Sequence, residues 1–399
     1  MIAAGASSQA DLDLVVWGAT GFTGRLVAER LVSHGQGLRW GLAGRDVEAL
    51  HRLREKIGAP ADTPLLVADA HDAESLRALV SRTRVVLSTV GPFLRHGSLL
   101  VDLCAASGTD YVDINGEPLW VRDMIDRFES DARRTGARIV FSCGFDSLPF
   151  ELGVHVLETQ ARKRWDAPLP RVSSRIAFTD VGGFTAGTVS TLVASADAAR
   201  ADHATGALAA DPFLLTGGFR GPQQPRPTGP EFDDRLGMWA APWVMASINE
   251  ANLHRSNALQ GHAWGEDFTY DEMMLAGPGE AGREIAEGIT EVMAAIVAPR
   301  VAGAPAIDQA GPVVGGAPSY KVLVLGTDAD GHRMTATVSG EGDPGSDAAA
   351  AMALEAARCV LHDLPDAPGG MWTPGALAPA QIAARLIENG VLTFSAFAR

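Results

Sequence analysis

Apolar residues in the first part of the chain follow two alternating spacings. Short apolar runs, typical of buried strands, occur near residues 13–17, 38–43, 64–68, 84–90, 111–114 and 137–142. Between and after them, apolar residues return at helical spacing near residues 25–34, 46–57, 72–82, 97–107, 118–135 and 147–164. Strands that alternate with helices in this way form a doubly wound parallel sheet. We therefore predict an α/β domain over residues 1–150.

The second part of the chain loses this alternation. Strands are predicted near residues 171–179, 239–248, 268–275, 319–325 and 333–338, the last two joined by a hairpin turn at Asp328-Ala329-Asp330-Gly331. Helices are predicted from Thr185, as a cap after the loop 180–188, to about Arg200, and near residues 280–297, 346–361 and 373–392. This order predicts a second α+β domain with a mixed sheet over residues 151–372. We expect a C-terminal helix within residues 373–399 to pack back on the first domain.

Glycine and proline crowd residues 216–230, which predicts a loop without a core of its own. A loop of this length in a compact domain is usually a lid, a binding loop or a disordered segment. We favour a lid.

The first apolar run leads into three glycines at the spacing Gly-x-x-Gly-x-x-Gly, and a helix follows. In a dinucleotide-binding turn, Gly18 would allow the tight turn, Gly21 the approach of a pyrophosphate, and Gly24 the close packing of helix on strand. The helix N-terminus would present free N–H groups to the phosphates. The residues expected at the phosphates are Gly18, Thr20, Gly21, Phe22, Thr23 and Gly24. A turn that binds nothing is the structural alternative, and the flanking strand and helix favour a Rossmann-type site.

The second strand ends at Gly44-Arg45, where an NAD site usually carries an acidic residue for the ribose 2′-hydroxyl. An arginine there can pair with a 2′-phosphate through charge-assisted hydrogen bonds. We therefore predict NADP(H) as the cofactor, and we expect Asp46 to cap the next helix.

Ligands of doubly wound sheets bind outside the carboxyl ends of the strands. The residues at these ends that we assign to the cofactor are Gly44, Arg45, Asp69, Thr89, Val90, Gly91, Pro92, Phe93, Gly144 and Asp146.

Composition narrows the class of protein. A formal charge of -15 over 399 residues argues against nucleic acid as a partner. Cys104, Cys143 and Cys359 have neither disulfide nor metal-ligand spacing, so we expect a reducing, cytoplasmic setting and no metal. The N-terminus lacks the pattern of a signal peptide, and no apolar stretch is long enough to span a bilayer. Peripheral contact with a membrane remains compatible with the sequence.

These motifs together resemble the saccharopine dehydrogenase-like oxidoreductases. The segments that carry the resemblance are residues 18–24, 43–45, 88–93, 111–113, 116–117 and 144–149, with weaker similarity at residues 183–188 and in the closing helix. Within that family the chain looks most like the trans-acting enoyl reductases. The resemblance implies hydride transfer from NADPH to the C=C bond of a polyketide or lipid acyl chain, carried by a carrier protein or synthase. It also makes a homodimer an expectation.

Two other functions stay open at the level of sequence. A saccharopine-type amino-acid dehydrogenase would need several cationic side chains around its dicarboxylate substrate. Residues 213–245 offer only Arg220, Arg226 and Arg235 among several aromatic residues, which favours an acyl chain. A non-catalytic NADP-binding sensor or scaffold is the other alternative, because no catalytic acid is evident.

An enoyl reductase must stabilise a developing enolate and protonate the α-carbon. The candidates are His96, Asp146, Ser147 and Tyr111. Each has a structural alternative: His96 begins a helix, Tyr111 stands early in its strand, and Asp146 or Ser147 can cap the helix that contains Pro149. The sequence does not choose among them.

Overall fold

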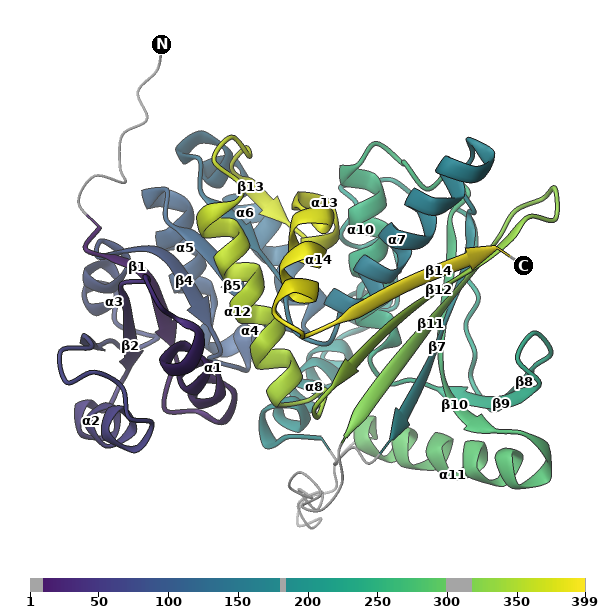
Figure 1. The fold of residues 1–399 in the computed structure, drawn as a ribbon, viewed down its shortest axis with the longest axis horizontal. Helices are drawn as coiled ribbons and strands as arrows, with labels where there is room; N and C mark the ends of the chain where they lie inside the picture. The colour runs from purple at the N-terminus through teal and green to yellow at the C-terminus, as the bar shows by residue number, and fades with distance from the viewer. Residues whose placement is uncertain (1–9, 180–183, 299–317, 399) are drawn as a thin grey trace. The chain divides into compact units, whose positions relative to one another are not determined.

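The computed structural model describes residues 10–179, 184–298 and 318–398, and the chain folds into two compact units (Figure 1). The first comprises Met1–Phe145 and Ser346–Arg385, and the second Asp146–Gly345 and Leu386–Arg399. Residues 346–372 lie in the first unit, whereas the sequence placed them in a second domain over residues 151–372. Residues 374–377 and 379–385, within the expected closing helix, are helical and belong to the first unit, whereas the last described residues, 393–398, form a strand of the second unit's sheet.

The first unit is built on a seven-stranded sheet in the order β13-β6-β5-β4-β1-β2-β3. Its strands are β1 (Leu12–Trp17), β2 (Trp40–Gly44), β3 (Leu65–Val67), β4 (Thr83–Ser88), β5 (Asp110–Asp113), β6 (Arg138–Val140) and β13 (Gly370–Trp372). Every pairing is parallel, which confirms the Rossmann-type sheet. The strand β13 was not predicted, because three residues after a Gly-rich loop carry no periodicity.

The helices of this unit are α1 (Phe22–His34), α2 (Val47–Lys56), α3 (Ala73–Val80), α4 (Phe93–His96), α5 (Ser98–Ser107), α6 (Pro118–Thr135), α12 (Asp347–His362), α13 (Pro374–Leu377) and α14 (Pro379–Glu388), the last of which crosses the unit boundary. Helix α1 packs on α12, while α5 packs on both α3 and α6. Because parallel crossovers are right-handed, reversal of the strand order at β1 puts α1 and α5 on opposite faces. The Asp46 side chain accepts the Ala49 N–H at 3.0 Å, which confirms the predicted cap of α2.

The second unit has a mixed seven-stranded sheet in the order β14-β12-β11-β7-β10-β9-β8, as expected for an α+β domain. Its strands are β7 (Arg171–Thr179), β8 (Glu231–Asp233), β9 (Met238–Pro242), β10 (Thr269–Gly277), β11 (Ser319–Thr327), β12 (Arg333–Glu341) and β14 (Thr393–Ala398). Strands β7 and β10 run parallel, and the other pairs are antiparallel.

The helices of the second unit are α7 (Leu148–Trp165), α8 (Ala186–Arg200), α9 (His203–Ala209), α10 (Ala246–Leu259) and α11 (Gly279–Val297). Helix α7 lies on β11 and β12, so close that a Cβ at Gly153 would stand 2.7 Å from Val324 Cγ2. Thr185 caps α8 as predicted, by accepting the Thr188 N–H at 3.2 Å. The preceding loop residues 180–183 lie outside the described residues.

The prediction of a strand over residues 239–248 was wrong in its second half. The strand β9 ends at Pro242, and α10 begins at Ala246. Every residue from Ile248 to Asn257 is buried, including asparagines, a glutamate, a histidine and an arginine. A helix buried on all sides with polar residues has no amphipathic period, so the pattern could not reveal it.

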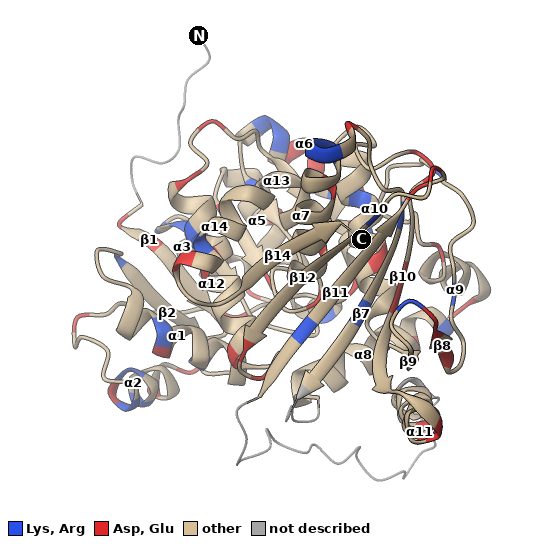
Figure 2. Ribbon diagram, turned by 45° about the vertical axis from the view of Figure 1, so that its right-hand side comes forward, with Lys and Arg blue, Asp and Glu red and all other residues tan. Residues whose placement is uncertain are grey.

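Charged residues of the first unit gather on its outer helices (Figure 2). On α6, Arg122 pairs with Asp126 at 2.7 Å and Arg127 with Asp123 at 2.9 Å, which balances the charges locally. Within the described ranges, none of the helices combines the length and the apolar character that crossing a bilayer would require.

Candidate functional site

The glycine turn of the first unit has the backbone geometry of a phosphate cradle. Gly18 has a φ of +86°, and a Cβ there would lie 2.6 Å from Val90 Cγ2. A Cβ on Gly24 would lie 2.2 Å from the carbonyl oxygen of Gly18, so only glycine lets α1 begin this close to β1. Gly21 caps α1 without a side-chain hydrogen bond, and Thr20, Gly21 and Phe22 are exposed. The turn therefore leaves helix N–H groups to a ligand, as a pyrophosphate requires.

A cluster of basic side chains lies at the carboxyl ends of β2, β3 and β4. Arg45 is exposed, and among the described residues it has no ion pair. His71 Nε2 lies 3.1 Å from His96 Nδ1. Burial lowers the pKa of His96, and the nearby His71 and Arg45 lower it further. Asp69 accepts the His71 N–H at 2.8 Å, which fixes the loop after β3.

The segment after β4 is tied to the glycine turn. Thr89 Oγ1 donates to the carbonyl oxygens of Trp17 and Gly18 at 3.1 and 3.3 Å. Val90 also lies beside Gly18, since a Cβ on Gly18 would stand 2.6 Å from Val90 Cγ2. Gly91 is exposed and Pro92 is half-buried, while the Phe93 side chain is buried against Trp120.

Glu117 has a role that the sequence analysis missed. Its carboxylate accepts the N–H groups of Phe93 and Leu94, each at 2.7 Å, and so holds the start of α4. The Gly116-Glu117 pair had been noted only as part of the resemblance; its position after β5 was the available signal.

Tyr111 belongs to a buried network rather than to an open site. Its hydroxyl donates to Asp113 Oδ2 at 3.0 Å, and its side chain is fully buried. Asp113 also accepts the N–H groups of Asn115 and Ser142 at 3.1 and 2.9 Å, which joins the ends of β5 and β6. Burial raises the pKa of Asp113 to about 6. Gly144 packs closely against Ile114, because a Cβ on Gly144 would lie 3.4 Å from the Ile114 side chain.

In the second unit, the start of α7 meets a polar face of α10. Asn249, Asn252 and Ser256 lie on one side of α10, at helical spacings of three and four. Asn249 Nδ2 donates to Asp146 Oδ1 at 3.1 Å, Asn252 Nδ2 donates to Ser147 Oγ at 2.6 Å, and Ser256 Oγ donates to Glu151. Ser147 occupies the N-cap position of α7, as its structural alternative expected, and Pro149 lies in the first turn. The Ser147 side chain makes no capping hydrogen bond, and its Oγ accepts from Asn252 instead.

Asn249 joins two buried carboxyl groups. Its Nδ2 also donates to Glu272 Oε1 at 2.9 Å, and Tyr270 donates its hydroxyl to Glu272 Oε2 at 2.6 Å. Burial raises the pKa of Asp146 to about 6. Burial also raises the pKa of Glu272 to about 8, and the negative charge of Asp146 adds to that rise. Burial therefore favours the protonated form of both groups, and the negative charge of Asp146 favours it further at Glu272.

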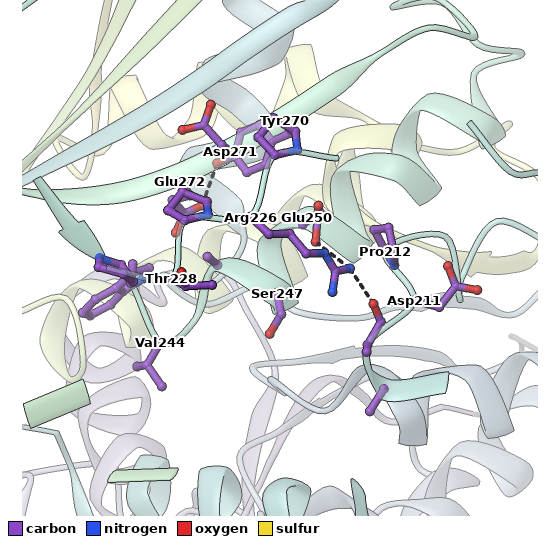
Figure 3. Close-up of a pocket in the computed structure, with 17 residues that line it drawn as sticks. Asp211, Pro212, Arg226, Thr228, Val244, Ser247, Glu250, Tyr270, Asp271 and Glu272 are labelled. Carbon is purple, nitrogen blue, oxygen red and sulfur yellow. Dashed lines mark hydrogen bonds and ion pairs between the residues drawn. The ribbon is translucent and has the colours of Figure 1, made fainter. Parts of the chain in front are cut away.

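Glu272 and Tyr270 line a cavity of about 320 Å³ in the second unit (Figure 3). One wall comes from residues 225–228 of the Gly- and Pro-rich loop, which forms neither helix nor strand, as predicted. Four acidic residues line the cavity, against one arginine. These are Asp211, Glu250, Asp271, Glu272 and Arg226.

The arginines of this loop region are held by acidic neighbours. Arg220 pairs with Asp211 at 2.9 Å, Arg226 lies 4.0 Å from Glu250, and Arg235 pairs with Asp233 at 2.7 Å. The sequence analysis had considered these three cations for a dicarboxylate substrate. Because carboxylates of the protein already pair with these arginines, the region suits a neutral ligand better than a dicarboxylate.

Comparisons with known proteins match a family model to the first unit and longer relatives to most of the chain. Residues 14–140 match the family model of the saccharopine dehydrogenase NADP binding domain. A trans-acting enoyl reductase of Mycobacterium bovis is 36% identical over 300 residues, covering 73% of this chain and 72% of that protein. A Mycobacterium tuberculosis protein, whose name assigns the same activity provisionally, is 34% identical over 409 residues, covering 96% of each chain.

A solved structure extends the likeness to the fold. The saccharopine dehydrogenase (L-Glu forming) of Saccharomyces cerevisiae covers 97% of this chain and is itself covered completely, with a TM-score of 0.51 at 14% identity. At that identity the likeness concerns the fold alone. On the sequence matches, the chain belongs to the saccharopine dehydrogenase-like oxidoreductases, in the branch of the trans-acting enoyl reductases.

Proposed function

We propose that this protein is an NADPH-dependent reductase that acts on the C=C bond of an enoyl thioester from polyketide or lipid synthesis. The observation that carries the proposal is the match to relatives named for that activity, over 96% of both chains for one relative and over 73% of this chain for another. The glycine turn and the cavity support it independently, the first for the cofactor and the second for the substrate class.

The proposed cofactor site uses the residues at the strand ends of the first unit. The N–H groups at the start of α1 would hold the pyrophosphate, and Arg45 would pair with the 2′-phosphate. The loops after β3 and β4, with Asp69, Thr89 and Val90, would border the ribose and base. When bound, NADPH supplies the hydride that reduces the β-carbon.

The substrate is proposed to be an acyl chain rather than an amino acid. The arginines near the cavity already pair with carboxylates of the protein, Arg226 with Glu250 and Arg175 with Asp271, which leaves them less available to a dicarboxylate. A thioester carries no charge at its reacting end, and the prolines, Trp243 and Val244 of the lining offer apolar contact. We extend the proposal to a cytoplasmic protein that receives its acyl chain from a carrier or synthase. A homodimer and peripheral membrane contact stay predictions.

The chain's own residues must also bring a proton to the α-carbon. Of the four candidates from the sequence, Tyr111 and Ser147 have hydroxyls engaged inside the protein, by Asp113 and Asn252. His96 lies beside His71 in the predicted cofactor site. Asp146 is the candidate that connects to the cavity, through Asn249 and Glu272.

The test is a comparison of substrates with purified protein and NADPH. We expect NADPH absorbance to fall with 2-enoyl thioesters of coenzyme A, faster for longer acyl chains, and to stay constant with 2-oxoglutarate plus lysine. Turnover with the second pair alone would establish the amino-acid dehydrogenase. Tight NADPH binding without turnover of either would favour a sensor or scaffold.

A further inference from the structure

The cavity of the second unit carries a carboxyl group placed to act as an acid. Glu272 and its hydrogen-bond donor Tyr270 both line this cavity, although each side chain is almost fully buried. Figure 3 shows Tyr270, Asp271 and Glu272 projecting from one strand beside the cavity. None of the four catalytic candidates from the sequence lines it.

Asn249 carries a buried acceptor beside the network around Glu272. Its side chain is fully buried, and in the described residues its Oδ1 has no hydrogen-bond partner. Its Nδ2 donates a hydrogen bond to Asp146 and another to Glu272. A side-chain amide offers a donor to an ionised carboxylate and, after rotation, an acceptor to a protonated one. Asn249 can therefore match the pair in either protonation state.

The charged and titratable groups around Glu272 come from several elements. Asp146 precedes α7, Tyr270 and Asp271 share β10 with Glu272, and Glu250 lies on α10. Asp271 pairs with Arg175 of β7 at 2.6 Å, and Glu250 lies 4.0 Å from Arg226. Asp146 has no ion pair within the described residues, and its negative charge favours a proton on Glu272, as does the charge of Asp271.

We propose that Glu272 is the general acid of the reaction, and that Asp146 and Asn249 are positioning residues that keep Glu272 protonated; this rests on the proposed enoyl reduction. Once the β-carbon has gained hydride, the π electron pair of the C=C bond moves to the α-carbon and thioester carbonyl. The O–H bond of Glu272 breaks as a C–H bond forms at the α-carbon, which leaves a Glu272 carboxylate. Solvent water entering the cavity then returns a proton to Glu272, and the saturated thioester leaves.

The first arm of the test replaces the acid. Glu272→Gln keeps the shape and the Tyr270 contact but cannot donate an acidic proton. We expect kcat with an enoyl thioester to fall by about 100-fold or more, while the Kd for NADPH from fluorescence titration stays unchanged. Glu158→Gln is the matched control, because Glu158 is equally buried in the same unit, has a pKa raised by burial to about 8, and does not line the cavity. We expect that variant to keep the wild-type rate.

The second arm of the test shifts the pKa of Glu272 by substitutions at its neighbours and keeps the Glu272 carboxyl group. In the wild type, kcat/KM should decline as pH rises past about 8, where Glu272 loses its proton. Asp146→Asn removes a negative charge and should move this decline to lower pH. Tyr270→Phe removes a hydrogen bond that stabilises the carboxylate and should move it to higher pH. A merely structural role would not produce shifts in opposite directions.

The outcomes separate the two proposals. A wild-type protein that reduces enoyl thioesters, with Glu272→Gln equally active, would overturn the assignment of Glu272 and leave the proposed function standing. An alkaline decline that moves with Glu250→Gln instead would also overturn it. A protein that binds NADPH and reduces no enoyl thioester would overturn the proposed function and this assignment together.

Discussion

The two units form their candidate sites from different parts of the polypeptide. In the first unit the backbone makes the site: Gly18 and Gly24 allow a turn that no side chain could occupy, and free N–H groups face outward. In the second unit buried side chains make it: Asn249 holds Asp146 and Glu272 beside a cavity. A backbone site needs glycine at fixed spacing and so leaves a signature. A buried polar network uses residue types that are usually found on surfaces, so it leaves no recognisable signature in the sequence.

The largest expected effect tests the backbone site. Gly24→Val would place side-chain atoms where the Gly18 carbonyl oxygen lies, since the Cβ alone would approach it to 2.2 Å. We expect the variant to lose NADPH binding and about 3 kcal/mol or more of stability. Fluorescence titration and thermal unfolding measure the two losses.

Gly288→Val is the matched control for that substitution. Gly288 is exposed on α11, and a Cβ there meets nothing within 4 Å. The control should bind NADPH as the wild type does. Normal NADPH binding by Gly24→Val would refute the backbone description of the first unit.

The next effect concerns the side-chain network. Asn249→Ala removes the donor that Asp146 and Glu272 share, which leaves buried carboxyl oxygens without it. We expect the free energy of unfolding to fall by about 1–3 kcal/mol in urea denaturation. Gln36→Ala, which truncates an exposed amide of the first unit, should change it little. Equal stability of the two variants would show that the network adds nothing to the second unit.

Arg45→Ala returns to the first unit and tests its one assigned side chain. Loss of a charge-assisted pair with the 2′-phosphate should raise the Kd for NADPH about 10- to 100-fold. The Kd for NADH should stay within about twofold, because NADH has no phosphate there. Parallel titrations with both nucleotides decide the point, and equal changes would refute the assignment.

A further prediction concerns the pH dependence of stability. Burial raises the pKa of folded Glu272 from its ordinary value near 4.5 to about 8, so the folded state binds more protons between these values. Stability should therefore fall as pH rises from about 4.5 to about 8. Glu272→Gln should flatten this slope in urea denaturation series, whereas replacement of the exposed Glu48 by Gln should not. An unchanged slope in Glu272→Gln would show that Glu272 does not hold a proton.

The first unit could be predicted closely because its signals are local. The apolar runs gave the first six strands, Asp46 gave a helix cap, and the glycine spacing indicated the turn. Phe93 shows the limit: its place after β4 suggested a pocket wall, but packing on Trp120 buries it. Side-chain direction depends on a helix distant in sequence, which a local pattern does not contain.

The cavity of the second unit could not be predicted for the same reason. Asn249 and Glu272 belong to α10 and β10, and only the fold brings them to Asp146. Its place after β6 makes Asp146 a candidate at the level of sequence, with a helix cap as the structural alternative. Helix α10 was itself missed, because its buried asparagines give no apolar face.

Isotope transfer tests the central claim, enoyl reduction by this chain, most directly. Purified protein would be given NADPH deuterated at the transferring position of the nicotinamide, with a 2-enoyl thioester in ordinary water, and the product analysed by mass spectrometry and NMR. The account predicts a saturated thioester with one deuterium at the β-carbon and a solvent hydrogen at the α-carbon. Absence of deuterium from the thioester, or its appearance at a carbonyl carbon, would contradict it.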